Sequence, residues 1–261
     1  MINLSVRFFG KFDVEAVDDV NLKMHEGELL GLVGESGSGK TMLALAVAGL
    51  NPRGQTEVTG EIRYGGVDLL KLSGKELRQI QGKDISMIFQ EPMTSLNPLM
   101  KIGLQIEEPL KLHTNLSKND RKTLALEAIE QVELPNPEKT YEKFPHQLSG
   151  GQRQRAMIAA AIITKPQLLI ADEPTTALDT VVQGQIIELL KKINESAKVG
   201  ILFISHDLSV VRKLCTRVAV MHNGKIVEDA STEDIFKNPQ NDYTVSLINA
   251  IPGRSKRRRV I

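Results

Sequence analysis

The sequence of 261 residues predicts an α/β protein. We expect a mixed, largely parallel sheet with flanking helices, an N-terminal antiparallel β-subdomain and an inserted α-helical subdomain. Three observations predict this class. The runs at 29–33, 168–171 and 201–204 are apolar on both faces, as strands of a buried parallel sheet are. Residues 2–32 hold short strand-like segments with no helix between them, which favours antiparallel pairing. From about 91 to 165 the character is helical, and apolar residues recur at helical spacing.

The first apolar run leads into a glycine-rich loop and then into a helix at 42–48. Glycines let the backbone N–H groups point inward at an anion, and the helix N-terminus adds positive potential. Lys40 would reach the β- and γ-phosphates of a nucleotide, and the Thr41 hydroxyl would hold Mg²⁺. This strand–loop–helix context favours a P-loop NTPase core over a glycine turn that binds nothing. The loop consists of Gly34, Glu35, Ser36, Gly37, Ser38, Gly39, Lys40 and Thr41.

The remaining elements follow in chain order. We expect strands at 4–8, 14–17, 20–22, 62–64 and 84–89, with a Gly65-Gly66 turn after the fourth. One helix begins after Ser117, where Asp120 takes the glutamate position of a capping box. A second helix begins after Gly151 and ends before Pro166. The C-terminal part is expected to hold an amphipathic helix at 180–194 and a hairpin at 218–221 and 225–227.

This order predicts a single domain over 1–261 with an insertion. Residues 1–90 and 166–250 would form the core with its antiparallel subdomain, and about 91–165 the helical subdomain. A basic tail covers 251–261. For the tail we expect a solvated disordered end, with attraction to an anionic membrane surface as the alternative.

Composition limits the classes of function. Lys and Arg number 33 against 32 Asp and Glu, so the charge gives no reason to expect nucleic acid as a partner. The one cysteine, Cys215, excludes an intrachain disulfide and any zinc or iron–sulfur site built on cysteines, and it suits a reducing cytoplasm. No run of about 18 apolar residues is present, so we expect no membrane span. The N-terminus lacks the layout of a signal peptide.

Polar residues follow three of the predicted strands. Asp172 ends the strand at 168–171, where a carboxylate could hold a metal ion. Glu173 comes next and would point toward an attacking water as general base. Gln90 and His206 each end a strand on the side expected for the nucleotide, and His206 would contact the γ-phosphate.

Residues 148–152 place a serine and two glycines at the start of a helix, which makes a second anion-binding site in the chain. An ordinary helix cap with a glycine turn is the alternative. The spacing leaves open whether this helix end reaches a phosphate of its own chain or of another.

Together these motifs resemble those of the ATP-binding subunit of ABC transporters, over nearly the whole chain. The resemblance assigns 34–41 to Walker A, 168–172 with Glu173 to Walker B and the catalytic glutamate, Gln90 to the Q-loop, 148–152 to the signature, 177–179 to the D-loop and His206 to the H-loop. It implies ATP and Mg²⁺ as cofactors. The metal ligands would be Thr41, Gln90 and Asp172, and catalysis would use Glu173, His206 and Gln90.

The same resemblance implies a head-to-tail dimer of two ATP-binding subunits, identical or different. Ser149, Gly151 and Gln152 of one subunit would then complete the nucleotide site of the other. In this family an aromatic residue of the N-terminal strands usually stacks on adenine. Here that residue would be Phe12, with Phe9 as the alternative.

A narrower resemblance is to the peptide and nickel importer branch, at residues 89–98, 204–208 and 238–244. It implies two integral permease subunits, an indirect link to an extracytoplasmic substrate-binding protein, and a place at the cytoplasmic face of the membrane. Peptide-type members often carry a C-terminal extension with cysteines for an iron–sulfur cluster. Its absence here favours the nickel or metal-chelate subgroup over short peptides.

Two other classes of protein share these motifs. An ABC-type ATPase of a non-transport enzyme assembly, such as one for phosphonate breakdown, is the alternative. A DNA-repair or ribosome-associated ABC protein is disfavoured, because the sequence has neither a long heptad insertion nor a second cassette.

Gln90 marks the junction between the core and the helical region. A γ-phosphate contact at Gln90 would be present with ATP and lost after hydrolysis, so we expect the helical region to rotate against the core. A membrane partner would be held near 91–105, with Met93 and Leu96 in the coupling contact. The alternative is that both side chains pack the core of their own subdomain.

Overall fold

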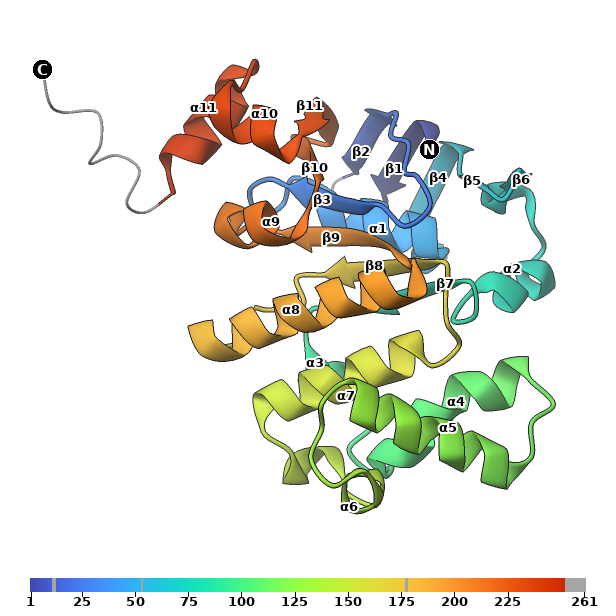
Figure 1. Cartoon of the computed structure of the whole chain (residues 1–261). Helices are drawn as coiled ribbons and strands as arrows, with labels where there is room; N and C mark the ends of the chain where they lie inside the picture. The colour runs from blue at the N-terminus through green and yellow to red at the C-terminus, as the bar shows by residue number, and fades with distance from the viewer. Residues whose placement is uncertain (11–12, 53, 177, 252–261) are drawn as a thin grey trace, which may run out of the picture. The chain divides into compact units, whose positions relative to one another are not determined.

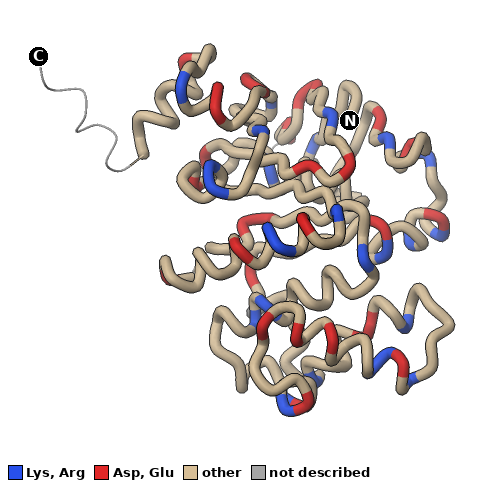
Figure 2. Tube along the Cα trace, viewed as in Figure 1, with Lys and Arg blue, Asp and Glu red and all other residues tan. Residues whose placement is uncertain are grey.

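The structure is a computed structural model that describes residues 1–10, 13–52, 54–176 and 178–251, the side chain of Met93 excepted. The chain forms two compact units, one of Met1–Ser73 with Leu202–Ile261 and one of Gly74–Ile201. Figure 1 labels their helices and strands. Acidic and basic residues are interspersed along both units, as Figure 2 shows, in keeping with the nearly balanced charge. Among the described residues no helix is long and apolar enough to cross a membrane.

The first unit opens with a three-stranded antiparallel sheet in the order β2-β1-β4. The strands are β1 (Ile2–Phe8), β2 (Val14–Val20) and β4 (Thr56–Glu61). In β1 the side chains of Leu4 and Val6 are fully buried while their neighbours are more exposed, which is the alternation of a sheet with one covered face. The predicted antiparallel subdomain is therefore present.

Two details of this sheet differ from the sequence prediction. The separate strands expected at 14–17 and 20–22 are one strand, because the polar pair Asp18-Asp19 stays in the sheet. The backbone N–H of Asp19 donates to Ser5 Oγ at 3.0 Å, and Asp19 takes a left-handed conformation with φ 50°. The strand β4 was not predicted, since its sequence Thr-Glu-Val-Thr-Gly-Glu carries a single large apolar residue.

The loop-bearing part of the first unit is built on β3 (Leu29–Val33), which is buried at all five residues, as its apolar run predicts. β3 pairs in parallel with β10 (Arg217–His222), and β10 pairs antiparallel with β11 (Lys225–Ser231). A Cβ at Gly31 would lie 2.5 Å from Val211 Cγ1, so glycine is needed for α9 (Leu208–Leu214) to approach the strand. The sheet is thus mixed, as expected.

The rest of the first unit consists of helices and short strands or turns. Residues 65–66 turn between β5 (Arg63–Tyr64) and β6 (Val67–Asp68), which confirms the predicted glycine turn. Cys215 is buried, and burial raises the pKa of its thiol, so it behaves as a small apolar residue. The remaining elements are α1 (Lys40–Ala48), a 3₁₀ turn (Leu69–Lys71), α10 (Thr232–Lys237), α11 (Asp242–Asn249) and most of β9 (Gly200–Ser205).

The second unit combines a parallel strand pair with most of the helices. β7 (Ile85–Ile88) pairs with β8 (Leu168–Asp172), and Ile88 lies opposite Ala171. Helices α4, α5, α6 and α7 pack against one another. The helices are α2 (Gly74–Ile80), α3 (Pro92–Ser95), α4 (Ile102–His113), α5 (Lys118–Gln131), α6 (Pro137–Tyr141), a 3₁₀ turn (Pro145–Gln147), α7 (Gly150–Ile162) and α8 (Thr180–Ala197).

The start of α5 differs slightly from the predicted capping box. Ser117 Oγ accepts from the backbone N–H of Asp120 at 3.2 Å, as expected. The Asp120 carboxylate accepts from the Ser117 hydroxyl at 2.6 Å. A capping box would instead use that side chain for the Ser117 backbone N–H. Helix α5 has the apolar face that helical spacing predicts, since Ala125, Ala128 and Ile129 are buried.

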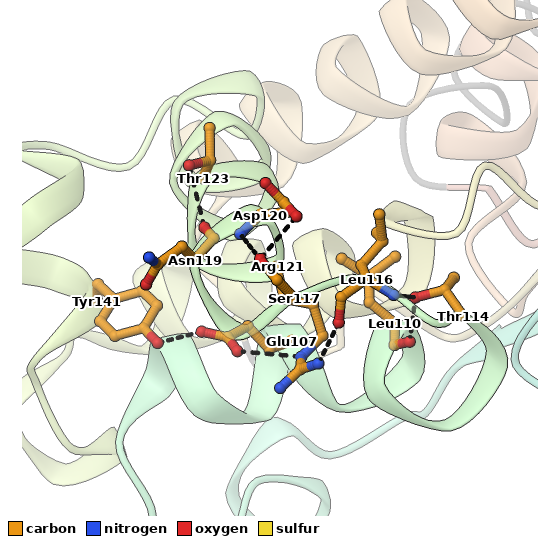
Figure 3. Close-up of polar contacts among 10 residues, drawn as sticks. All are labelled: Glu107, Leu110, Thr114, Leu116, Ser117, Asn119, Asp120, Arg121, Thr123 and Tyr141. Atoms are coloured by element: carbon orange, nitrogen blue, oxygen red, sulfur yellow. Dashed lines mark hydrogen bonds and ion pairs between the residues drawn. The ribbon is translucent and has the colours of Figure 1, made fainter.

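A buried polar cluster joins three helices of the second unit (Figure 3). The hydroxyl of Tyr141 on α6 donates to Glu107 Oε1 on α4, and Arg121 Nε on α5 lies 3.7 Å from Glu107 Oε2. Arg121 also donates to the carbonyl of Leu116 at 2.6 Å. A Cβ at Gly103 would lie 2.0 Å from the Tyr141 ring, so glycine makes room for the ring against α4.

Candidate nucleotide-binding site

The predicted phosphate loop lies between β3 and α1 and curls around the Lys40 ammonium group. Lys40 is 5% exposed, and its Nζ donates to the Gly34 carbonyl at 2.9 Å, the Glu35 carbonyl at 2.7 Å and Ser38 Oγ at 3.2 Å. A buried lysine needs such partners, because an unpaired buried charge is costly. The loop residues Glu35, Ser36 and Gly37 are exposed. The lysine is thus held beneath an exposed loop.

Two glycines of the loop lie too close to other backbone for any side chain. A Cβ at Gly39 would lie 2.0 Å from the Ala16 carbonyl oxygen, and φ there is 103°. A Cβ at Gly34 would lie 2.1 Å from the Met221 carbonyl oxygen. The two glycines are therefore required because β2 lies close to Gly39 and β10 lies close to Gly34.

The same hairpin supports the loop further. The backbone N–H of Gly224, in the turn between β10 and β11, donates to the Ser38 carbonyl at 3.1 Å. Tyr243 on α11 accepts from the backbone N–H of Glu35 at 3.0 Å. Sequence reasoning did not place Tyr243 at the site. The signal was present, since Tyr243 lies in one of the segments that carry the importer resemblance.

In the second unit, Gln90 and Glu173 come together although 83 residues separate them. Gln90 Nε2 donates to Glu173 Oε2 at 3.1 Å, and Thr176 Oγ1 donates to the same oxygen at 2.9 Å. Gln90 follows β7 and Glu173 follows β8, so the parallel pairing of the two strands brings their carboxyl ends together. Thr176 is a neighbour that the sequence did not indicate.

Asp172 and Glu173 are adjacent but differ in environment. Asp172 is the last residue of β8 and is 2% exposed. Glu173 has φ 45°, a left-handed conformation that costs a non-glycine residue about 1–2 kcal/mol. Such conformations cluster at functional sites. Asp172 is thus buried at the end of the strand, whereas Glu173 follows it in a strained backbone conformation.

The predicted signature segment begins α7 with a complete capping box. Ser149 Oγ accepts from the backbone N–H of Gln152 at 3.3 Å, and Gln152 Oε1 accepts from the backbone N–H of Ser149 at 3.1 Å. A Cβ at Gly151 would lie 2.6 Å from Val182 Cγ1 of α8. Packing against α8 therefore explains the second glycine, and the helix-cap alternative describes Ser149 in this structure.

The other predicted site residues lie within the two units as follows. Thr41 is exposed in the first turn of α1, and His206 is exposed directly after β9. Phe12 lies outside the described residues. Its alternative Phe9 is 40% exposed, with its backbone N–H bound to the Gln55 carbonyl at 2.7 Å.

The predicted metal ligands suit magnesium by their chemistry. Among the described residues, no group of three or more His, Cys, Asp or Glu could hold a metal ion by itself. Thr41 offers a hydroxyl oxygen, Asp172 a buried carboxylate and Gln90 an amide oxygen. Mg²⁺ prefers such oxygen ligands and is usually bound by one or two carboxylates together with substrate phosphates. Each of the three residues therefore offers an oxygen donor that suits the ion.

A strand, a glycine loop closed on a buried lysine and a helix define a nucleotide-binding protein of the P-loop class. Comparison with known families is more specific. The profile of the ABC transporter family matches residues 17–176, which is more than half of the chain. The chain belongs to the ABC transporter family. The predicted family, α/β fold class and enzyme class, an ATPase of this family, are confirmed.

Curated relatives cover almost the whole chain. The oligopeptide transport ATP-binding protein OppD of Lactococcus lactis is 46% identical over 251 residues, which are 96% of this chain and 74% of the relative. OppD of Bacillus subtilis is 48% identical over 92% of the chain and 67% of the relative. The dipeptide transport ATP-binding protein DppD of Haemophilus influenzae is 45% identical over 95% and 76%.

A solved structure supports the fold. The dimeric ATP-binding cassette MJ0796, described in a post-hydrolysis state bound to ADP and Pi, has a TM-score of 0.77 to this chain at 30% identity. The match covers 88% of this chain and 97% of that one.

Proposed function

We propose that this chain is the ATP-hydrolysing subunit of a membrane importer for short peptides. The observation that carries the proposal is the loop closed on Lys40, found in a chain whose relatives are described as oligopeptide and dipeptide transport proteins. The sequence alone favours the nickel or metal-chelate subgroup. The names of these relatives favour short peptides instead. The subunit would sit at the cytoplasmic face of the membrane on two permease subunits, with a substrate-binding protein as an indirect partner.

The loop would bind the phosphates of ATP. Lys40 now donates to loop carbonyls and to Ser38, and an incoming phosphate would compete for the ammonium group. A charge-assisted bond from lysine to phosphate is stronger than one to a neutral carbonyl. Thr41 and Asp172, with Gln90, would hold Mg²⁺, which would neutralise charge on the phosphates when bound.

Glu173 would be the general base. Its Oε2 accepts from Gln90 and Thr176, so the carboxylate is oriented by two donors at the end of β8. To take a proton from water, Glu173 needs a free lone pair, and a carboxylate with two oxygens has about four acceptor positions. His206 would contact the γ-phosphate, where the transition-state charge gathers.

Ser149, Gly151 and Gln152 would act on the nucleotide of a second subunit. The capping box uses the backbone N–H groups of Ser149 and Gln152, so an anion would meet the N–H groups of Gly150 and Gly151, which is the usual chemistry of a helix N-terminus. The dimeric cassette among the similar structures supports a dimer of ATP-binding subunits.

A membrane partner would dock near residues 91–105. Leu96 is 7% exposed, which supports the alternative that it packs within its own unit. The side chain of Met93 lies outside the description. Leu99 is 85% exposed and Leu104 41% exposed in the same stretch, so we propose Leu99 as the apolar contact for a permease. Leu99→Asp should lower uptake while ATPase activity is retained, and Leu96→Asp should reduce both together with stability.

The test is uptake in cells with and without this subunit. A labelled short peptide and radioactive nickel are supplied separately, and a Glu173→Gln variant serves as the inactive control. Loss of peptide uptake alone supports the proposal, and loss of nickel uptake alone supports the metal subgroup. Normal uptake of both, with recovery of the chain in a complex without integral membrane proteins, would favour the alternative of a non-transport enzyme assembly.

A further inference from the structure

Tyr243 occupies a well-anchored position beside the phosphate loop. Its backbone N–H donates to the side chain of Asn241, the N-cap of α11, at 2.9 Å. The chain entering this helix is tied to β11, because the backbone N–H groups of Gln240 and Asn241 donate to the two oxygens of Glu228 at 2.8 and 3.1 Å. The ring stacks on His222 at the end of β10, with 3.8 Å between ring centroids and 26° between planes.

The hydroxyl of Tyr243 contacts the loop at one peptide group. The backbone N–H of Glu35 donates to Tyr243 Oη at 3.0 Å. The carbonyl of Gly34, which belongs to the same planar peptide group, accepts from Lys40 Nζ at 2.9 Å. Tyr243 and Lys40 therefore hold the two ends of one peptide plane.

The peptide plane between Gly34 and Glu35 needs a contact from outside the loop to prevent its rotation. Glu35 lies between Gly34 and the exposed Ser36-Gly37 pair, where glycine backbones have wide conformational freedom. Rotation of the plane would move the Gly34 carbonyl and with it the resting position of the ammonium group. Burial raises the pKa of Tyr243 above its ordinary value, so the phenol stays neutral. A neutral phenol oxygen has lone pairs that accept from the Glu35 N–H.

We propose that Tyr243 is a positioning residue for ATP binding: its hydroxyl holds the peptide between Gly34 and Glu35, and through it the Lys40 ammonium group. The inference rests on the proposed role of the loop in binding the phosphates. We expect its effect on nucleotide binding, since Tyr243 Oη accepts from the loop backbone and its ring stacks on His222.

The experiment compares Tyr243→Phe, which removes the hydroxyl and keeps the ring on His222, with Tyr243→Leu, which removes both. ATP affinity is measured by isothermal titration in EDTA, so that hydrolysis does not interfere, and KM and kcat are measured with Mg²⁺. Tyr141→Phe is the matched control, because it deletes a buried tyrosine hydroxyl in the other unit. Lys40→Ala tests whether the loop binds the phosphates of ATP at all.

We expect Tyr243→Phe to weaken ATP binding about threefold to tenfold, the effect of one lost hydrogen bond, and to raise KM equally. Its kcat should stay within about twofold, because the hydrolytic groups are untouched. Tyr243→Leu should be little worse in affinity than the phenylalanine variant. Tyr141→Phe should lower stability and leave ATP affinity unchanged.

Two outcomes separate this inference from the function on which it rests. If Lys40→Ala weakens binding while Tyr243→Phe binds ATP as the unchanged chain does, or more tightly, the positioning role is overturned. A loss of affinity in Tyr243→Leu without one in Tyr243→Phe also overturns it, because the ring alone would then matter. If Lys40→Ala binds ATP normally, the proposed role of the loop itself fails.

Discussion

Replacing Tyr141 by phenylalanine should lower the free energy of unfolding of the second unit. Tyr141 is 5% exposed and Glu107 is 5% exposed, and the tyrosine hydroxyl donates to the Glu107 carboxylate (Figure 3). A hydrogen bond to a charged group contributes about 1.5–3 kcal/mol, and the variant leaves that carboxylate buried with one donor fewer. At about 2–4 °C per kcal/mol, a loss near the middle of this range shifts the unfolding midpoint by about 4–9 °C.

The assay is thermal unfolding followed by circular dichroism, with Glu107→Gln as the companion variant. The amide oxygen of glutamine can still accept from Tyr141, so Glu107→Gln should cost less than Tyr141→Phe. The double variant should show coupling, because the two residues are in contact. A midpoint for Tyr141→Phe within about 1 °C of the unchanged chain would refute the reasoning, since it implies less than about 0.5 kcal/mol.

The same bond predicts an alkaline limit to stability. Burial, and then the hydrogen bond to Glu107, raise the pKa of Tyr141 above its ordinary value. A group with a raised folded-state pKa stabilises fully below its unfolded pKa, about 10 for tyrosine, and loses that stabilisation as the pH rises above it. Tyr141→Phe should therefore show a smaller loss of stability above about pH 10 than the unchanged chain does.

The remaining predictions concern the site. Glu173→Gln should bind ATP and persist as a dimer in gel filtration, with turnover lower by about 10²–10⁴, and hydrolysis within about twofold would contradict its role. Lys40→Ala should weaken ATP affinity by about tenfold or more in titration, because a charged donor is lost; unchanged affinity would contradict the phosphate-loop assignment. Gly151→Ala should cost about 1–3 kcal/mol in urea unfolding, because its Cβ would lie 2.6 Å from Val182, whereas Gly150→Ala has 3.8 Å to Leu178 and should be mild.

Local pattern predicted most of the fold. The strand at 29–33, the loop after it and the helix at 42–48 follow from apolar runs and glycines, and all are present, the helix beginning at Lys40. β4 could not be predicted in this way, because a polar strand is defined by its partner β1 and not by its own sequence. The strands expected at 14–17 and 20–22 are joined in β2, where the backbone N–H of Asp19 donates to Ser5, 14 residues away.

The sequence predicted which residues belong to the site, but it did not predict the contacts that those residues make. Lys40 and Glu173 stand in motifs whose chemistry requires them. The bond from Gln90 to Glu173 depends on the pairing of β7 with β8, and the bond from the Glu35 N–H to Tyr243 spans 208 residues. Neither contact has a local signature, since each is set by tertiary packing.

The capping box at Ser149 has a consequence for the start of α7 when the proposed dimer closes. The bond from the Gln152 N–H uses a lone pair of the Ser149 hydroxyl and leaves its hydrogen to donate elsewhere. In the proposed dimer, the serine could turn that hydrogen toward a phosphate of the facing subunit without giving up its role as a cap. Closure would then require no fraying of α7, so the N–H groups of Ser149 and Gln152 should stay protected from hydrogen exchange in the monomer and in the closed dimer.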